Sequence, residues 1–371
     1  MKIVCEKEKL IKGINSVVKG VSSRTTMPIL EGILIQTNDN SLKLTTYDLE
    51  IGIEYIMDCT VEQQGATVVN SIMFSEIIRK LPNTDISITL NEKNLLVIEC
   101  EGSVYKLSTM NADEFPTLPN IDIESKISLS QGALKEMIKK TIFAVSIEEN
   151  RPIFTGCLIE VQDDNLNVVA VDGFRLALRK LPMAPNVEKF SAVIPGKYLN
   201  EIVKNLQDID EVVNIGISKN QALFELNNCK IVTRLLEGDF LNYNNVIPKE
   251  RETRIKVNKN ALQSAIERAS IFSISAAEKE KKYPIKIYVS LGSIIISCTS
   301  QIGDAKEEVL VETTGKELEI GFNPKYLIDA LKAVEDDEVY LDFGSSISPC
   351  IIRPIVDEKY TYMVLPVRLK E

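Results

Sequence analysis

The sequence repeats itself at a fixed spacing, and this repeat limits the folds open to the chain more than any other feature. When the 371-residue sequence is shifted by 124 positions, Gly32 falls on Gly156 and Asp48 falls on Asp172, with no gap between them. The apolar runs that begin at the two glycines also coincide, since Gly-Ile-Leu-Ile matches Gly-Cys-Leu-Ile. A period of this length predicts a chain assembled from copies of one structural unit.

A third copy is weaker but recognisable. Asn258-Lys-Asn-Ala-Leu resembles Ser130-Gln-Gly-Ala-Leu, and a later Lys-Tyr-Leu run matches one that lies within the second copy. Charged segments that follow Pro119 and Pro248 mark the junctions between copies. We therefore predict three domains, at residues 1–125, 126–253 and 254–371.

Each copy has the pattern of a strand, a helix and several strands, followed by the same order again. The first helix is the clearest, because Leu10, Ile14, Val17 and Val21 form an apolar stripe while Lys12 lies on another face. Together with strand-like alternating runs, this predicts an α+β protein of three repeated domains. The six helices are expected at residues 6–21, 71–81, 130–146, 195–207, 258–273 and 323–334.

The charge distribution permits two interpretations. The chain holds 43 Lys and Arg against 53 Asp and Glu, a net charge of −10, which argues against a protein that coats nucleic acid through its overall charge. The six predicted helices nevertheless carry a net positive charge, and the rest of the chain is strongly acidic. Lysine is a good helix former on any solvated face, so the helices are either simply solvated or gathered on one basic surface.

The composition disfavours catalysis. With no histidine, the chain lacks Ser-His and Cys-His nucleophile pairs and every histidine-containing metal site. It also has no glycine-rich phosphate loop, so we predict no enzyme activity, no metal and no cofactor, with catalysis by Asp172 or by Asp163-Asp164 as the remaining alternative. Seven widely spaced cysteines predict reduced core residues. The absence of a signal peptide or an apolar membrane span predicts a cytoplasmic protein.

Four segments resemble a known family. They are Ala170-Val-Asp-Gly-Phe-Arg-Leu-Ala, Thr26-Met-Pro-Ile-Leu, Leu107-Ser-Thr-Met with Asp113-Glu-Phe-Pro, and the terminal Leu365-Pro-Val-Arg-Leu. In order and separation they are similar to the bacterial sliding clamps, the beta subunits of DNA polymerase III, and the resemblance spans the whole chain. It implies the DNA-clamp fold, in which each domain is a duplicated strand-helix-strands unit. It also implies a head-to-tail homodimer that closes into a ring with helices lining the inside and sheets forming the outside.

The same resemblance implies a function. The ring would be a processivity factor that encircles duplex DNA without sequence specificity and slides along it. It would tether the replicative polymerase, and bind the clamp loader and repair factors, through short linear motifs, with no membrane involved. The alternative that remains open is a repeat-built protein-interaction scaffold that does not encircle DNA.

Three sets of residues follow, each of which could instead be ordinary surface or core. For DNA contact the resemblance implies Arg24, and the helix charges add Lys12, Arg79, Lys80, Lys139 and Lys197. Ring closure would use Tyr105 and Leu107 of an edge strand at 103–109, meeting Ile271 and Phe272 of the second subunit. The implied motif pocket comprises Arg151, Phe154, Val171, Phe174, Arg175, Leu176, Leu241, Val246, Asn323, Tyr326, Ile347, Leu365, Pro366, Val367, Arg368 and Leu369.

The pocket departs from the family at its rim. The family usually has His where Phe174 stands, and commonly has Pro and Arg where Leu241 and Asn245 stand. The rim is therefore less basic here, which predicts a somewhat different preference among motifs.

Overall fold

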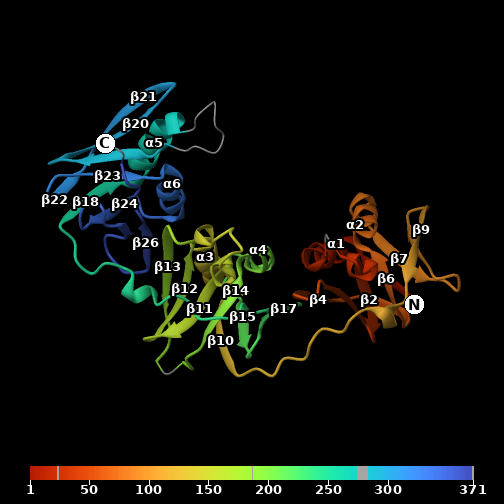
Figure 1. Cartoon of the computed structure of the whole chain (residues 1–371). Helices are drawn as coiled ribbons and strands as arrows, with labels where there is room; N and C mark the ends of the chain where they lie inside the picture. The colour runs from red at the N-terminus through yellow and green to blue at the C-terminus, as the bar shows by residue number, and fades with distance from the viewer. Residues whose placement is uncertain (23–24, 186, 274–282, 370–371) are drawn as a thin grey trace. The chain divides into compact units, whose positions relative to one another are not determined.

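The computed structural model of the protein describes residues 1–22, 25–185, 187–273 and 283–369 (Figure 1). Six α-helices lie within these residues, and each begins at the predicted position or one residue after it. All six end before the predicted residue, and three of them do so by four residues or more, where the chain goes on to form a 3₁₀ turn at 18–20, 142–144 or 270–273. The helices are α1 (Lys7–Val17), α2 (Ser71–Lys80), α3 (Gln131–Lys139), α4 (Gly196–Asn205), α5 (Lys259–Ala269) and α6 (Pro324–Ala333).

Asparagine caps fix the start of three of these helices. The side-chain oxygen of Asn70 accepts a hydrogen bond from the Met73 amide at 3.0 Å, and Asn258 and Asn323 cap α5 and α6 in the same way. Such a cap stabilises a helix by about 1 kcal/mol because it satisfies an amide that has no partner inside the helix. The acidic runs after residues 207 and 334 lie beyond the ends of α4 and α6. Each of the six described helices therefore carries more Lys and Arg than Asp and Glu.

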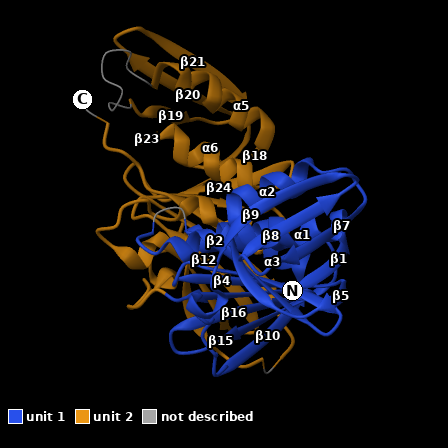
Figure 2. Cartoon of the chain, turned by 90° about the vertical axis from the view of Figure 1, so that its right-hand side faces the viewer, with its two compact units in different colours: residues 1–135, 197–235 blue, residues 136–196, 236–371 orange. Residues whose placement is uncertain are grey.

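The chain divides into two compact units, which Figure 2 shows in different colours. Unit 1 comprises residues 1–135 and 197–235. Its strands form one sheet of 13 described strands in the order β10-β15-β16-β17-β4-β3-β2-β6-β9-β8-β7-β1-β5. The strands are β1 (Lys2–Glu6), β2 (Gly32–Asn38), β3 (Ser41–Tyr47), β4 (Ile51–Asp58), β5 (Thr60–Gln63), β6 (Ala66–Asn70), β7 (Asp85–Leu90), β8 (Leu95–Cys100), β9 (Ser103–Met110), β10 (Ser125–Ser130), β15 (Val212–Ile217), β16 (Gln221–Leu226) and β17 (Cys229–Arg234).

Unit 2 comprises residues 136–196 and 236–371 and contains two sheets. The larger has nine described strands in the order β14-β11-β12-β13-β26-β25-β24-β18-β22, and the smaller has the order β21-β20-β19-β23. The strands are β11 (Gly156–Gln162), β12 (Asn165–Val171), β13 (Arg175–Pro182), β14 (Ser191–Pro195), β18 (Thr253–Asn258), β19 (Ile285–Val289), β20 (Ser293–Ser300), β21 (Gly303–Leu310), β22 (Glu312–Gly315), β23 (Leu318–Phe322), β24 (Glu338–Phe343), β25 (Cys350–Arg353) and β26 (Tyr360–Val364).

The order of elements confirms the predicted repeat. In each third of the chain a strand and a helix precede a group of strands, after which a second strand, a helix and three more strands follow. The sheets nevertheless join neighbouring repeats, because β17 pairs with β4 in unit 1 and β13 pairs with β26 in unit 2. The compact units therefore do not coincide with the sequence repeats, and the middle repeat contributes strands to both.

The repeated glycines stand where a strand begins beside another backbone or side chain. A Cβ on Gly32 would lie 2.4 Å from Val68 Cγ1, and a Cβ on Gly156 would lie 2.6 Å from the carbonyl oxygen of Ile194. Real Cβ atoms do not approach other atoms so closely, so both positions require glycine. In each of the first two repeats, a 3₁₀ turn that starts with proline leads directly into this glycine.

Candidate functional site

A tight turn between β12 and β13 leaves the side chain of Phe174 exposed and the side chain of Arg175 buried. Asp172 Oδ1 accepts hydrogen bonds from the amides of Phe174 at 2.9 Å and Arg175 at 3.0 Å, and Gly173 takes a φ of 92° between them. Asp48 makes the same side-chain turn in the first repeat, with the amides of residues 50 and 51. The repeated aspartate is therefore a turn residue. The turn leaves Phe174 57% exposed.

Arg175 lies beneath this turn in a buried ionic network. Its Nε donates to Asp172 Oδ2 at 2.9 Å, and its Nη1 donates to Asp329 Oδ2 at 2.7 Å. The guanidinium also lies 4.6 Å from the centroid of the Tyr326 ring, within range for a cation–π interaction. Burial alone would raise the pKa of Asp329, but hydrogen bonds from Lys325 and Arg175 lower that pKa below its usual value. The network holds α6 against the start of β13.

Phe174 and Tyr326 form an aromatic wall above this network. Their ring centroids are 6.2 Å apart with an angle of 19° between the planes, which is a stacked arrangement. The C-terminal segment runs alongside, since the Leu365 amide donates to the Phe174 carbonyl oxygen and the Val367 amide donates to the Gly321 carbonyl oxygen, both at 2.8 Å. The pair of bonds positions the terminal Leu-Pro-Val-Arg-Leu run next to the wall.

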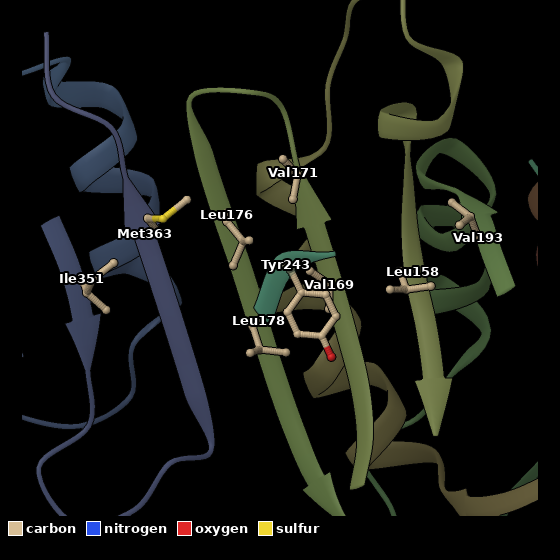
Figure 3. Close-up of a cluster of buried hydrophobic side chains, with 9 residues drawn as sticks. All are labelled: Leu158, Val169, Val171, Leu176, Leu178, Val193, Tyr243, Ile351 and Met363. Carbon is tan, nitrogen blue, oxygen red and sulfur yellow. The ribbon is translucent and has the colours of Figure 1, made fainter. Parts of the chain in front are cut away.

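A buried apolar cluster forms the floor beside the wall. Figure 3 shows its side chains on neighbouring strands of the nine-stranded sheet, with the Tyr243 ring over β12 and β13. Tyr243 donates a hydrogen bond to Glu160 at 2.5 Å, which fixes the ring in place. Partly buried apolar residues of the chain at 153 and at 236–247 pack against the same cluster. The cluster comprises Leu158, Val169, Val171, Leu176, Leu178, Val193, Tyr243, Ile351 and Met363.

The structure places all the predicted pocket residues in unit 2, but in different roles. Val171 and Leu176 are buried in the floor, Arg175 is buried in the ionic network with Asp172 and Asp329, and the side chain of Asn323 is engaged as a helix cap. Four apolar side chains remain exposed around the floor, and the half-buried Tyr326 ring lies beside them; we call Phe174, Leu241, Val246, Tyr326 and Val367 the apolar patch. Arg151, Ile347 and Arg368 are exposed, whereas Phe154, Leu365, Pro366 and Leu369 are half-buried.

Sequence reasoning missed several residues of this floor. Phe240 packs edge to face on Phe154 at 5.8 Å between ring centroids, and Ile153 and Ile247 pack against the buried cluster. Each stands next to a predicted residue in the sequence, and this proximity was the only available signal. Tyr243 and Met363 were also missed, because their part in the floor depends on long-range pairing of strands.

Five of the six predicted DNA-contact residues lie on described helices. Lys12 is exposed on α1, Lys139 is exposed at the end of α3, and Lys197 is exposed on α4 with its Nζ 4.4 Å from the Tyr198 ring centroid. Arg79 and Lys80 are exposed on α2, where both pair with Glu76, at 2.6 and 3.6 Å. Arg24 lies outside the described residues.

The predicted interface strand has an open edge. β9 pairs with β8 along its length, but with β6 only at its last two residues, so in the described chain the other edge of 103–108 has no strand partner. Tyr105 is 41% exposed on this strand. In the four-stranded sheet of unit 2, β21 also stands at an edge, and the Phe272 ring lies against Gly303 at its start. Ile271 is 66% exposed, and Leu107 is half-buried.

The described ranges contain neither an arranged cluster of metal ligands nor a helix suited to crossing a membrane. No group of three or more Cys, Asp or Glu side chains there is arranged to hold a metal ion. Six cysteines are buried and Cys59 is half-buried, and all seven are unpaired thiols. None of the helices in the described part of the chain is both long and apolar enough to cross a membrane.

Comparisons with known proteins agree along the whole chain. The sequence profiles of the DNA polymerase III beta subunit match in three parts: the N-terminal domain at residues 1–119, the central domain at 128–242 and the C-terminal domain at 244–368. The beta sliding clamp of Bacillus subtilis is 36% identical over 378 residues, covering 99% of this chain and 100% of the relative. The beta sliding clamp of Staphylococcus epidermidis is 35% identical over 378 residues, covering 99% of each chain.

Solved structures give the same result. A DNA polymerase sliding clamp from Bacillus subtilis superposes with a TM-score of 0.94 at 36% identity, and a putative DNA polymerase III beta subunit from Eubacterium rectale with a TM-score of 0.94 at 37% identity. Both comparisons cover 100% of each chain. With its threefold α+β repeat, its Asp-Gly-Phe-Arg turn and these full-length matches, the chain belongs to the DNA polymerase III beta subunit family and consists of three DNA-clamp domains.

Proposed function

We propose that the protein is a ring-shaped processivity factor that encircles duplex DNA and tethers the replicative polymerase to it. The observation that carries this proposal is the full-length match to beta sliding clamps, together with a net positive charge on each of the six described helices. The ring is a head-to-tail homodimer of chains with domains at 1–125, 126–253 and 254–371. It acts in the cytoplasm, uses no cofactor and catalyses no reaction of its own.

Weak helix contacts suit such a ring. Exposed cations on the helices attract phosphate groups without recognising individual bases. They are Lys12, Lys139 and Lys197, and Arg79 and Lys80 contribute further positive charge. A protein held on DNA by about six phosphate contacts loses on the order of a thousandfold in affinity between 50 and 200 mM salt. A closed ring stays on DNA mechanically, so its contacts can remain weak enough to permit sliding. Arg24 completes this set of proposed contacts.

Two open strand edges support the closure of the ring. β9 and β21 each present unpaired backbone groups, and such edges favour pairing with another chain. In the proposed dimer, β9 of one subunit pairs with β21 of the other. Tyr105 and Leu107 then meet Ile271 and Phe272, which lie beside the start of β21.

The apolar patch is the proposed docking site for partner motifs. Its exposed side chains surround a rigid floor, and each large apolar side chain that a partner buries there contributes about 1.5 to 3 kcal/mol. One shared site for short motifs accounts for a polymerase, a clamp loader and repair factors using the ring in turn. The other proposed pocket residues, among them Arg151, Phe154, Ile347 and the terminal 365–369 run, line the sides.

Primer extension tests the tethering role. With the replicative polymerase and loader from the same cells, the wild-type protein should lengthen the product made in one binding event. Leu241→Asp with Val246→Asp should remove this effect, whereas Leu291→Asp, which alters an apolar residue that is 85% exposed elsewhere, should not. Product length that is the same with and without the wild-type protein, while peptides still bind the patch, would favour the scaffold without DNA encirclement.

A further inference from the structure

One row of side chains crosses six strands of the nine-stranded sheet. In a β-ladder, directly opposed residues point to the same face, and neighbouring strands lie about 4.8 Å apart. The row starts under the apolar patch and passes through the buried floor into β18. In strand order the row is Val171, Leu176, Met363, Ile351, Asp342 and Arg254.

At the far end of this row, three guanidinium groups lie around one buried carboxylate. Asp342 is a buried carboxylate, 7% exposed, and Arg254 engages it with two hydrogen bonds at 2.6 and 2.7 Å. Arg353 Nε lies 3.6 Å and Arg251 Nη1 3.9 Å from the same carboxylate, which is ion-pair range but too long for hydrogen bonds. In the described chain, neither of these two guanidinium groups donates a side-chain hydrogen bond. Three guanidinium charges therefore share one carboxylate.

A cavity opens over this cluster, which we call the arginine cavity. Its volume is about 410 Å³, and it is lined by the three arginines, Asp342 and Ile351 together with residues 248–250 and 354–358. Ile351 belongs to both the buried floor and the cavity wall, so the two are continuous. Carboxylates at 250, 357 and 358 also line the cavity, and Asp357 pairs with Lys359 at 3.8 Å.

We propose that the arginine cavity binds a carboxylate side chain of the same peptide that docks on the apolar patch. This inference rests on the proposed function of the patch and adds a charge requirement to it. Arg251 and Arg353 have unused, forked N–H donors, and such forks match the two oxygens of a carboxylate. The occupant is therefore a linear motif that carries an Asp or Glu beside its hydrophobic residues.

The register of the strands sets how far the acidic residue of the peptide must lie from its hydrophobic residues. Leu176 and Asp342 are three strands apart, which corresponds to about 14 Å. An extended peptide advances about 3.3 Å per residue, so the acidic residue stands about four positions from the residue that lies over Leu176. At this spacing the carboxylate reaches the cavity while the hydrophobic side chains occupy the patch.

Two fluorescein-labelled peptides test the proposal. Both have a Leu-Phe core; one carries Asp or Glu four residues away on each side, and the other carries Asn or Gln there. The wild-type protein should bind the acidic peptide about two- to fivefold more tightly, and the advantage should shrink as salt rises. Arg251→Gln with Arg353→Gln should remove this advantage and leave the neutral peptide unaffected.

A matched control variant and two distinct outcomes separate a failure of the carboxylate site from a failure of the apolar patch. Lys219→Gln with Lys230→Gln removes the same charge from exposed positions of unit 1 and should preserve the advantage. Equal affinity of the wild-type protein for both peptides, at low and high salt, would overturn the carboxylate site and leave the patch intact. Binding of neither peptide would overturn the role of the patch and this inference with it.

Discussion

Replacing Arg175 by Met should destabilise unit 2 and loosen the wall of the apolar patch. The guanidinium, 8% exposed, is the shared partner of Asp172 and Asp329, whose side chains are 11% and 23% exposed. Methionine fills a similar volume but leaves both carboxylates without this partner. It also removes the cation beneath Tyr326, the ring on which Phe174 stacks.

The expected magnitude follows from burial. Removing one partner of a buried ion pair costs about 3 to 5 kcal/mol, because the remaining charge stays desolvated. Asp329→Asn is a milder change that keeps Arg175 paired with Asp172, and it should cost about 1.5 to 3 kcal/mol, as for a lost hydrogen bond to a charged group. Arg175→Lys keeps the charge but cannot reproduce the forked pair of bonds, so its cost should lie between the two.

Urea unfolding followed by circular dichroism measures these differences. At pH 7 the free energy of unfolding should fall in the order wild type, Asp329→Asn, Arg175→Lys, Arg175→Met. The pKa of Asp329 is lowered in the folded protein, so its stabilising contribution is full above about pH 4 and is lost as the pH falls through that lowered pKa. The gap between wild type and Arg175→Met should therefore narrow below about pH 4. The reasoning would be refuted if Arg175→Met lowered the free energy of unfolding by less than about 1 kcal/mol at pH 7. It would also be refuted if the difference between this variant and the wild type grew below about pH 4.

Three further outcomes are expected. Leu176→Ala removes a side chain that is 1% exposed and should lower the free energy of unfolding by about 2 to 5 kcal/mol; a change below about 1 kcal/mol would show that the floor is not tightly packed. Tyr105→Asp with Ile271→Asp should give monomers in sedimentation velocity, and an unchanged dimer would disprove the interface. Iodoacetamide at pH 8 should modify Cys59 well before Cys157, because burial raises the pKa of the Cys157 thiol to about 12; equal rates would contradict this burial.

The sequence was most informative where local rules apply. The 124-residue offset predicted the repeated domains, and the stripes of apolar residues predicted six helices that all begin within one residue of the expected position. Local rules were weaker at the helix C-termini, because a 3₁₀ turn preserves the apolar spacing for one more turn. The pairing of β17 with β4 could not be predicted, because it joins segments about 180 residues apart through backbone bonds that carry no sequence signature.

At the candidate site, too, local features could be predicted from the sequence, whereas contacts between distant segments could not. The Asp-Gly-Phe-Arg turn was recognisable from its residues, but the part played by Arg175 as a buried partner of Asp329 depends on where α6 packs. The arginine cavity gave no signal in the sequence, because Arg251 and Arg353 are about 100 positions apart and meet only through the register of β18, β24 and β25. Predicting either arrangement requires the strand order of the nine-stranded sheet.

The dwell time of the loaded protein on circular and on linear DNA tests encirclement most directly. A nicked circular plasmid carrying the protein is passed through gel filtration in about 200 mM salt, and half of the sample is first cut once with a restriction enzyme. The protein should stay with the circle and leave the cut molecule, because a closed ring can slide off only at an end. Equal loss from the two forms would mean that the protein is held by charge alone, and the ring would be excluded.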